Sequence, residues 1–174
     1  TRYTASSGIA DLRQAVCDKF RTDNGLLYKP AEVLVSSGAK HSIYNAVMAL
    51  CEDGDEVLMP VPYWVSYPEM VRLAGGNPVE IPTTIATGFK VTAEQVEKAI
   101  TPKTSLIIIN SPSNPTGAIY TEEEMRAIAE VCVRHNIAVI SDEIYEKLIY
   151  EGKHVSFAAL SPEAKAITIT VNGV

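Results

Sequence analysis

Short apolar runs alternate with helical patterns along most of the chain, and this alternation constrains the fold more than any other feature of the sequence. The runs are rich in Val and Ile. Most are apolar throughout, as strands are when both faces of their sheet are covered. Strands that alternate with helices favour a parallel sheet. We therefore predict an α/β fold of three layers, α/β/α, around a mostly parallel sheet.

Local signals place the individual helices and strands. Thr92 and Thr121 each precede a Gln or Glu by three residues, which is the spacing of a capping box at a helix start. Gly25 follows an amphipathic pattern and is typical of a helix end. We expect helices at residues 8–24, 63–73, 92–100 and 121–135, and a further helix through Ile43, Val47 and Leu50. We expect strands at residues 32–36, 56–59, 79–81, 105–110, 137–141 and 166–171.

The composition is typical of a folded domain and argues against several classes of protein. The 174 residues are 47% hydrophobic and 21% charged, without repeats or linkers, which indicates one domain over residues 1–174. Acidic residues outnumber basic ones by 21 to 15, and no basic patch is present to bind nucleic acid. The apolar run at residues 106–109 is far shorter than the roughly 20 residues of a membrane span. We expect neither a nucleic-acid partner nor a membrane.

The three cysteines lie far apart in the sequence, in apolar helical contexts: Cys17, Cys51 and Cys132. They form no CxxC pair and no His cluster lies near them, so we expect no metal site. We interpret them as buried free thiols. Because free thiols persist in a reducing compartment, we expect a cytoplasmic protein.

Residues just after each predicted strand are candidates for ligand binding, because open parallel sheets bind ligands beyond the carboxyl ends of their strands. Gly38, Ala39 and Lys40 lie between the first predicted strand and a helix. The N–H groups of a helix start favour an anion such as phosphate, and Lys40 would add a positive charge. A turn that only connects strand to helix explains the segment equally well. The segment lacks the Gly-Lys-Ser/Thr of a P-loop, and the chain contains no GxGxxG.

An aromatic residue and an amide-rich loop follow two further predicted strands. Trp64 is the only tryptophan, and its ring would stack on a planar ligand, although core packing is the commoner fate of a single Trp. Residues 110–117 indicate a rigid loop in which Asn114-Pro115 is a candidate for a cis peptide bond. The Asn114 amide would then donate to a ligand oxygen. A purely structural turn accounts for the prolines, but less well for the two asparagines.

Asp142 stands at the end of a predicted buried strand, where a carboxylate is costly unless a cation or hydrogen bonds compensate it. Asp142 and Tyr145 are three residues apart and would share a face if a helical turn begins there. Glu143 would then point elsewhere, which argues against an acid pair of the glycosidase type. An Asp that only caps a helix is the alternative interpretation.

Together, these segments resemble the large domain of the class I, fold-type-I, pyridoxal-phosphate aminotransferases, especially the bacterial aspartate aminotransferase group. Each motif alone is weak, but their order and spacing match over essentially the whole chain. The resemblance implies transfer of an amino group between an amino acid and a 2-oxo acid, and a homodimer in the full-length form. The matching segments are Tyr3 with Gly8-Ile9 and Leu12-Arg13, residues 37–40 (SGAK), 62–68 (PYWVSYP), 110–117 (NSPSNPTG) and 141–145 (SDEIY).

The resemblance implies two phosphate contacts for pyridoxal 5′-phosphate. Gly38, Ala39 and Lys40 would hold the phosphate in the same subunit, with the backbone amides of Ala39 and Lys40 as donors. Tyr3 would reach across a dimer interface to the phosphate of the neighbouring subunit.

The resemblance also assigns residues to the ring of the cofactor. Trp64 would stack on the pyridine ring, and Asn114 and Tyr145 would hydrogen-bond its phenolic oxygen. Asp142 would keep the ring nitrogen protonated, so that the ring can accept electrons from a substrate carbanion. Trp64 and Asn114 would also help to seat the α-carboxylate of an amino-acid substrate.

The resemblance further implies that the catalytic lysine is missing from this chain. In the family, a segment like residues 170–173 leads within a few residues to a Ser-Lys pair, whose lysine forms the Schiff base. None of the nine lysines occupies that motif. We therefore expect a partial large domain, without the small domain or the region after the last strand, that is inactive in transamination alone. The alternatives are a noncatalytic protein that binds pyridoxal phosphate or phosphate, and an interaction module that keeps only the fold.

Overall fold

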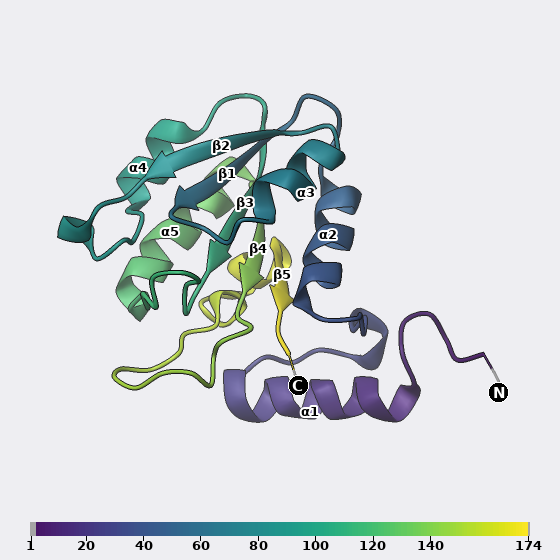
Figure 1. Cartoon of the computed structure of the whole chain (residues 1–174). Coiled ribbons are helices and arrows are strands. Elements are labelled where there is room, and N and C mark those ends of the chain that lie inside the picture. The colour runs from purple at the N-terminus through teal and green to yellow at the C-terminus, as the bar shows by residue number, and fades with distance from the viewer. Residues whose placement is uncertain (1–2, 174) are drawn as a thin grey trace.

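The computed structural model describes residues 3–173, which form a five-stranded sheet between two layers of helices (Figure 1). Every neighbouring pair of strands is parallel. The predicted α/β/α fold with a mostly parallel sheet is therefore confirmed. The strands, in the spatial order β2-β1-β3-β4-β5, are β1 (Glu56–Val61), β2 (Asn77–Pro82), β3 (Thr104–Asn110), β4 (Ala138–Asp142) and β5 (Thr168–Val171).

Helices cover both faces of the sheet. Helices α2 and α3 pack on one face, and α4, α5 and α6 pack on the other. Helix α1 lies apart from the sheet, across the bottom of the view in Figure 1. The helices are α1 (Ala10–Asn24), α2 (Ala39–Leu50), α3 (Tyr67–Leu73), α4 (Ala93–Ala99), α5 (Glu122–His135) and α6 (Pro162–Ala166), with 3₁₀ turns η1 (Pro30–Glu32), η2 (Ile85–Thr87) and η3 (Phe157–Ala159).

Successive residues of the central strands enter different cores. Val57 and Leu106 pack with α2 and α3, whereas their neighbours Leu58 and Ile107 pack with α4 and α5. All four are fully buried. Burial of one such side chain contributes about 1.5–3 kcal/mol to folding. Both faces of each strand must therefore be apolar, which is why these runs are continuous rather than alternating.

The predicted helix signals are present in the structure. The Thr92 hydroxyl accepts the Gln95 N–H at 3.3 Å, and the Thr121 hydroxyl accepts the Glu124 N–H at 3.2 Å. In each case the Gln or Glu side chain accepts the Thr N–H in return, which completes a capping box. Gly25 ends α1 in the left-handed conformation, at φ 67°.

The predicted strand at residues 32–36 is wrong. Residues 33–35 lie outside the sheet, and Leu34 is 57% exposed. Their backbone N–H groups bond to loop residues instead: Val35 donates to the Ser7 carbonyl at 3.0 Å, and Val33 donates to the Pro30 carbonyl at 3.4 Å. A β-branched run forms a strand only where a neighbouring strand accepts its hydrogen bonds and its side chains are buried, and here neither condition is met.

Several element boundaries also differ from the prediction by a few residues. The helix expected from residue 63 begins at Tyr67, because Pro68 has no N–H to donate to a preceding turn and fits only the first turn of a helix. The last strand begins at Thr168 rather than at residue 166, because α6 occupies residues 162–166. The Ser161 hydroxyl caps this short helix by accepting the Ala164 N–H at 3.1 Å.

The three cysteines are buried free thiols, as predicted. Burial raises the pKa of Cys132 to about 12, so its thiol is not ionised at neutral pH. No helix within residues 3–173 has the length and apolar character needed to cross a membrane.

Candidate functional site

The carboxyl ends of β1, β3 and β4 point to the same edge of the sheet, where the predicted site residues lie. From β1 the chain first runs to β2 on one side and later returns to β3 on the other side. The crevice beyond β1 and β3 is therefore a topological switch point, the usual ligand site of open parallel sheets.

Asp142, the last residue of β4, is the centre of this edge. Its side chain is buried, with 4% of the residue exposed. The Tyr67 hydroxyl donates to Oδ2 at 2.5 Å, and the Ile144 N–H donates to Oδ1 at 3.2 Å. Burial raises the pKa of Asp142, whereas these two hydrogen bonds act in the opposite direction. The structure thus confirms a buried carboxylate that is held by hydrogen bonds at the end of a strand.

Aromatic contacts connect Asp142 to the start of α2. The Trp64 ring meets the Tyr67 ring edge to face, with centroids 5.6 Å apart at 85°. The Lys40 ammonium nitrogen lies 4.8 Å from the centroid of the Trp64 ring. Tyr67 therefore joins the segments after β1 and β4, and Lys40 joins them to α2.

The asparagine-rich loop contacts the same carboxylate-bearing residue. The Asn110 amide donates to the Asp142 carbonyl oxygen at 2.9 Å, and its oxygen accepts the Asn114 N–H at 2.7 Å. The Asn114-Pro115 peptide is cis, as predicted. Within residues 3–173, the Asn114 side-chain amide and the Tyr145 hydroxyl make no hydrogen bond. These two groups remain free to bind a ligand.

The start of α2 has the features of an anion site. Gly38 has φ 82°, and no atom lies within 4 Å of the place where a Cβ would be. In the described part of the chain, the N–H groups of Ala39 and Lys40 have no hydrogen-bond acceptor. The positive end of a 12-residue helix adds to the attraction for an anion.

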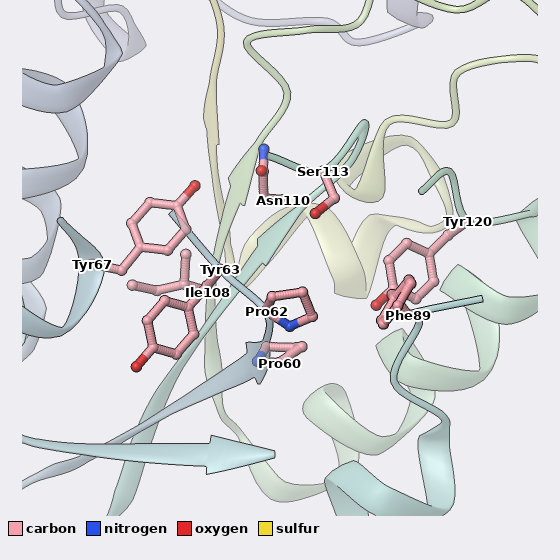
Figure 2. Close-up of a pocket in the computed structure, with 9 residues that line it drawn as sticks. All are labelled: Pro60, Pro62, Tyr63, Tyr67, Phe89, Ile108, Asn110, Ser113 and Tyr120. Carbon is pink, nitrogen blue, oxygen red and sulfur yellow. The ribbon is translucent and has the colours of Figure 1, made fainter. Parts of the chain in front are cut away.

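A narrow pocket opens beside this cluster, between the ends of β1 and β3 (Figure 2). Tyr67 and Asn110, which both contact Asp142, line one side, and Phe89 and Tyr120 lie together on the other. The predicted site residues do not line the pocket themselves, but are reached through Tyr67 and Asn110. The lining residues are Pro60, Pro62, Tyr63, Tyr67, Phe89, Ile108, Asn110, Ser113 and Tyr120.

Glu143 points away from Asp142, as expected, and belongs to a different cluster. Its Oε1 accepts hydrogen bonds from Ser141, Ser156 and the Phe157 N–H at 2.8, 3.0 and 3.1 Å. Its Oε2 lies 2.8 Å from Nε2 of His154. The two adjacent carboxylates therefore form no acid pair.

Glu146 extends this second cluster to distant parts of the chain. It pairs with the Lys19 ammonium and accepts from the amides of Asn24 and Asn172 at 2.7 and 2.8 Å. Glu143, Glu146 and His154 offer ligand atoms within 4.8 Å of one another, as a metal ion would require. Protein donors and the Lys19 ammonium also contact these two carboxylates, so the cluster links α1 to the segment after β5.

The structure unites most of the residues predicted for the site. Lys40, Trp64, Asn114 and Asp142 lie in one chain of contacts, and Gly38 and Ala39 begin the adjoining helix. Tyr145 lies near Tyr67 and contributes, after burial and Asp142, to the raised pKa of that tyrosine.

Tyr3 is separate from this cluster. It is fully exposed on an N-terminal arm that projects away from the sheet (Figure 1). Its predicted role concerns a second subunit, and within this chain it contributes nothing to the site.

Sequence reasoning assigned no role to Tyr67 or Asn110, although both lie in motifs that it identified. Tyr67 follows Trp64 by three residues at a helix start, a spacing that places two side chains on the same face. Asn110 is the last residue of β3, where ligand-binding side chains are expected. Both signals were available, but neither specified a contact with Asp142.

Comparison with known proteins gives the same picture over the whole chain. The family model for aminotransferase class I and II matches residues 1–174. An aspartate aminotransferase of Geobacillus stearothermophilus is 56% identical over 175 aligned positions, and an aspartate/prephenate aminotransferase of Thermus thermophilus is 48% identical over 173. These alignments cover 100% and 99% of this chain, and 44% of each relative.

Solved structures agree with these matches. The aspartate aminotransferase of Rhizobium meliloti has a TM-score of 0.97 at 44% identity, and that of Thermus thermophilus with maleate has 0.96 at 47%. Each match covers 100% of this chain, and 44% and 45% of those chains. The chain therefore spans less than half the length of the proteins it matches.

Proposed function

Since this chain belongs to the aminotransferase class I and II family, we propose that it forms the cofactor-binding core of an aspartate-type aminotransferase. The observation that carries the proposal is the contact chain from Lys40 through Trp64 and Tyr67 to Asp142. These contacts bring the start of α2, an aromatic face and a buried carboxylate together. Pyridoxal 5′-phosphate presents the matching groups: a phosphate, a flat ring and a basic ring nitrogen.

The start of α2 suits the phosphate of this cofactor. The unused N–H groups of Ala39 and Lys40 are donors, and the missing side chain of Gly38 leaves room for phosphate oxygens. Lys40 adds a positive charge near the Trp64 face. The N–H donors belong to the backbone at a helix end, so they are held rigidly before the ligand arrives.

The groups around Asp142 suit the ring. We assign Trp64 to the ring face, and Asn114 and Tyr145 to the phenolic oxygen, because their polar groups have no other partner within residues 3–173. Asp142 would bind the protonated ring nitrogen. A carboxylate with a raised pKa is a strong proton acceptor, and pairing with a cation would offset the cost of its burial.

The bound cofactor supplies an electron sink for the α-carbon of an amino acid. The residues of this chain hold that group in place. Asp142 keeps a proton on the ring nitrogen, and Trp64 restrains the ring and excludes water from one of its faces. We assign Trp64 and Asn114 to the substrate α-carboxylate as well, because each remains partly exposed.

We further propose amino acids and 2-oxo acids as substrates, with acidic side chains preferred. The relatives are named as aspartate or aspartate/prephenate aminotransferases, and one solved relative contains the dicarboxylate maleate. An aromatic aminotransferase of Pyrococcus horikoshii is 42% identical with a TM-score of 0.94, so the fold of this region is shared by enzymes of different specificity. The named substrates therefore support the class more strongly than the particular amino acid.

A homodimer completes this proposal. Tyr3 is fully exposed on an arm that projects from the body, as a residue that serves a neighbouring subunit would be. The buried free thiols support a reducing location, the cytoplasm.

Titration with pyridoxal 5′-phosphate tests the proposal. Trp64 is the only tryptophan, so all tryptophan fluorescence of the chain comes from this site. We expect saturable quenching that inorganic phosphate reverses by competition and that pyridoxal without phosphate reproduces only weakly. We also expect binding to be non-covalent, so that borohydride fixes no cofactor to the chain.

Two outcomes would contradict parts of this proposal. Unchanged Trp64 fluorescence and cofactor absorbance at millimolar cofactor would favour a module that keeps only the fold. Stoichiometric attachment of the cofactor to one lysine after borohydride would show that this chain supplies its own nucleophile.

A further inference from the structure

We propose that Tyr67 is a positioning residue that keeps the Asp142 carboxylate ionised and directed at the ring nitrogen of the cofactor. The inference deepens the proposed function and rests on it. None of the roles given to the other site residues applies to Tyr67. Its ring is buried in the core, and its hydroxyl donates to the Asp142 carboxylate.

The geometry fixes Tyr67 as a donor to Asp142. Tyr67 is 2% exposed, and its ring packs in the core beneath α2 and α3. Its edge-to-face contact with Trp64, at 5.6 Å, restrains the ring from the other side. The hydroxyl donates to Oδ2 at 2.5 Å. Because Tyr67 begins α3, its backbone is also held by the helix, and the carboxylate has little freedom to rotate.

Few groups around Asp142 favour its ionised form, and the Tyr67 hydroxyl is one of them. Within residues 3–173, no lysine, arginine or histidine forms an ion pair with Asp142. Burial opposes its ionisation, and so does Glu143, which directly follows β4. The groups that favour the anion are the Tyr67 hydroxyl and the Ile144 N–H. Without Tyr67, we expect Asp142 to take up a proton more readily and to lose its attraction for a protonated ring nitrogen.

The hydroxyl is a donor throughout the ordinary pH range. Burial raises the pKa of Tyr67, and so do the nearby Asp142 carboxylate and Tyr145. Tyr67 therefore stays protonated. A protonated phenol beside an ionised carboxylate directs its hydrogen at that carboxylate, which is the arrangement that stabilises the anion.

The chain contains a matched control for this tyrosine. Tyr63 lies four residues earlier and also donates to a carboxylate at 2.5 Å, but its partner is Glu80 on the exposed edge of β2. The substitutions Tyr67→Phe and Tyr63→Phe remove the same atom and the same kind of hydrogen bond. They differ in whether the carboxylate belongs to the site.

The test is the titration of Asp142 in the cofactor-free protein, followed by NMR of the ¹³C-labelled carboxyl group. We expect Tyr67→Phe to move the Asp142 midpoint to higher pH, and Tyr63→Phe to leave it unchanged. Replacing the Tyr67 side chain with 3-fluorotyrosine keeps its shape and makes the hydroxyl more acidic, so the midpoint should move to lower pH. This replacement also keeps the test valid if Tyr67→Phe does not fold. Equal midpoints in the folded variants would overturn the inference.

Cofactor affinity provides a second readout with a distinct pH signature. At neutral pH we expect Tyr67→Phe to bind pyridoxal 5′-phosphate about tenfold more weakly, the value of one hydrogen bond to a charged group. The loss should shrink as rising pH ionises Asp142 without help. A loss that is the same at every pH would mean that Tyr67 only supports the fold and would overturn the inference.

The two proposals fail in different ways. If the unaltered chain binds no cofactor, the proposed function fails, and so does the statement that Asp142 faces a ring nitrogen. If the cofactor binds but Tyr67→Phe changes neither the Asp142 midpoint nor the pH profile of binding, only the role of Tyr67 fails.

Discussion

Asp142 and Glu143 are adjacent acids at the end of β4, yet their surroundings differ. Glu143 accepts three hydrogen bonds and contacts His154, so protein groups satisfy its carboxylate. Asp142 accepts two hydrogen bonds, and beyond it lie the unused polar groups of the α2 start and the Asn114 amide. A buried acid with all its donors inside the protein stabilises the fold. A buried acid beside unused donors is arranged for a ligand.

The largest effect should come from breaking the satisfied cluster. Glu143→Ala leaves two hydroxyls and the Phe157 N–H buried without an acceptor. We expect the free energy of unfolding to fall by about 3–5 kcal/mol, measured by urea denaturation. Glu130→Ala, on the exposed face of α5, is the control and should change it by about 0.5 kcal/mol or less. A loss below about 1 kcal/mol for Glu143→Ala would remove the distinction between the two acids.

Asp142→Asn should separate stability from binding. Burial raises the folded-state pKa of this carboxyl above its unfolded value, so its ionisation lowers stability as pH rises between the two values. Removing the charge should therefore leave the free energy of unfolding at pH 7 unchanged or higher. Affinity for pyridoxal 5′-phosphate should fall about 100-fold, because the ring nitrogen loses its anionic partner. Fluorescence titration and urea denaturation measure the two quantities, and a parallel loss of both would show a structural acid.

Glu146 should show the opposite pH dependence. Burial opposes its ionisation, but Asn24, Lys19 and Asn172 together lower its pKa below the ordinary value of 4.5. Its stabilisation is then present above pH 4.5 and is lost as the pH falls through the folded-state value. We expect Glu146→Gln to cost about 2 kcal/mol at pH 7 and progressively less in acid, in urea denaturation at several pH values. A cost that does not change between pH 7 and pH 3 would contradict this assignment.

Features encoded by local sequence were predicted correctly. The capping boxes at Thr92 and Thr121, the cis Asn114-Pro115 peptide and the burial of Asp142 each depend on a few neighbouring residues and on which strand they follow. The apolar runs identified the central strands because both faces of those strands are covered. Most of the fold could therefore be predicted from local sequence signals and from the expected arrangement in layers.

Features that depend on distant partners were missed or wrong. Residues 33–35 have strand-forming side chains, but no strand in the described part of the chain lies beside them. Tyr67 and Asp142 are 75 positions apart, and Glu143 depends on Ser156 and His154 in a segment without periodic pattern. The packing of the layers determines which side chains meet across such separations. These contacts cannot be inferred from a single sequence.

The smallest effect should come from replacing Lys40. This substitution tests whether the backbone N–H or the side chain of Lys40 binds the phosphate. The Lys40 side chain is exposed and its ammonium lies over Trp64, whereas the proposed phosphate donors are N–H groups that Lys40→Gln retains. We expect affinity for pyridoxal 5′-phosphate to fall only about threefold, as for an exposed charge. Lys98→Gln, on α4 at the other face, should leave it unchanged. A loss of about 100-fold would show that the Lys40 side chain itself binds the phosphate. The anion site would then depend on a lysine ammonium, as the Glu146 carboxylate does on Lys19.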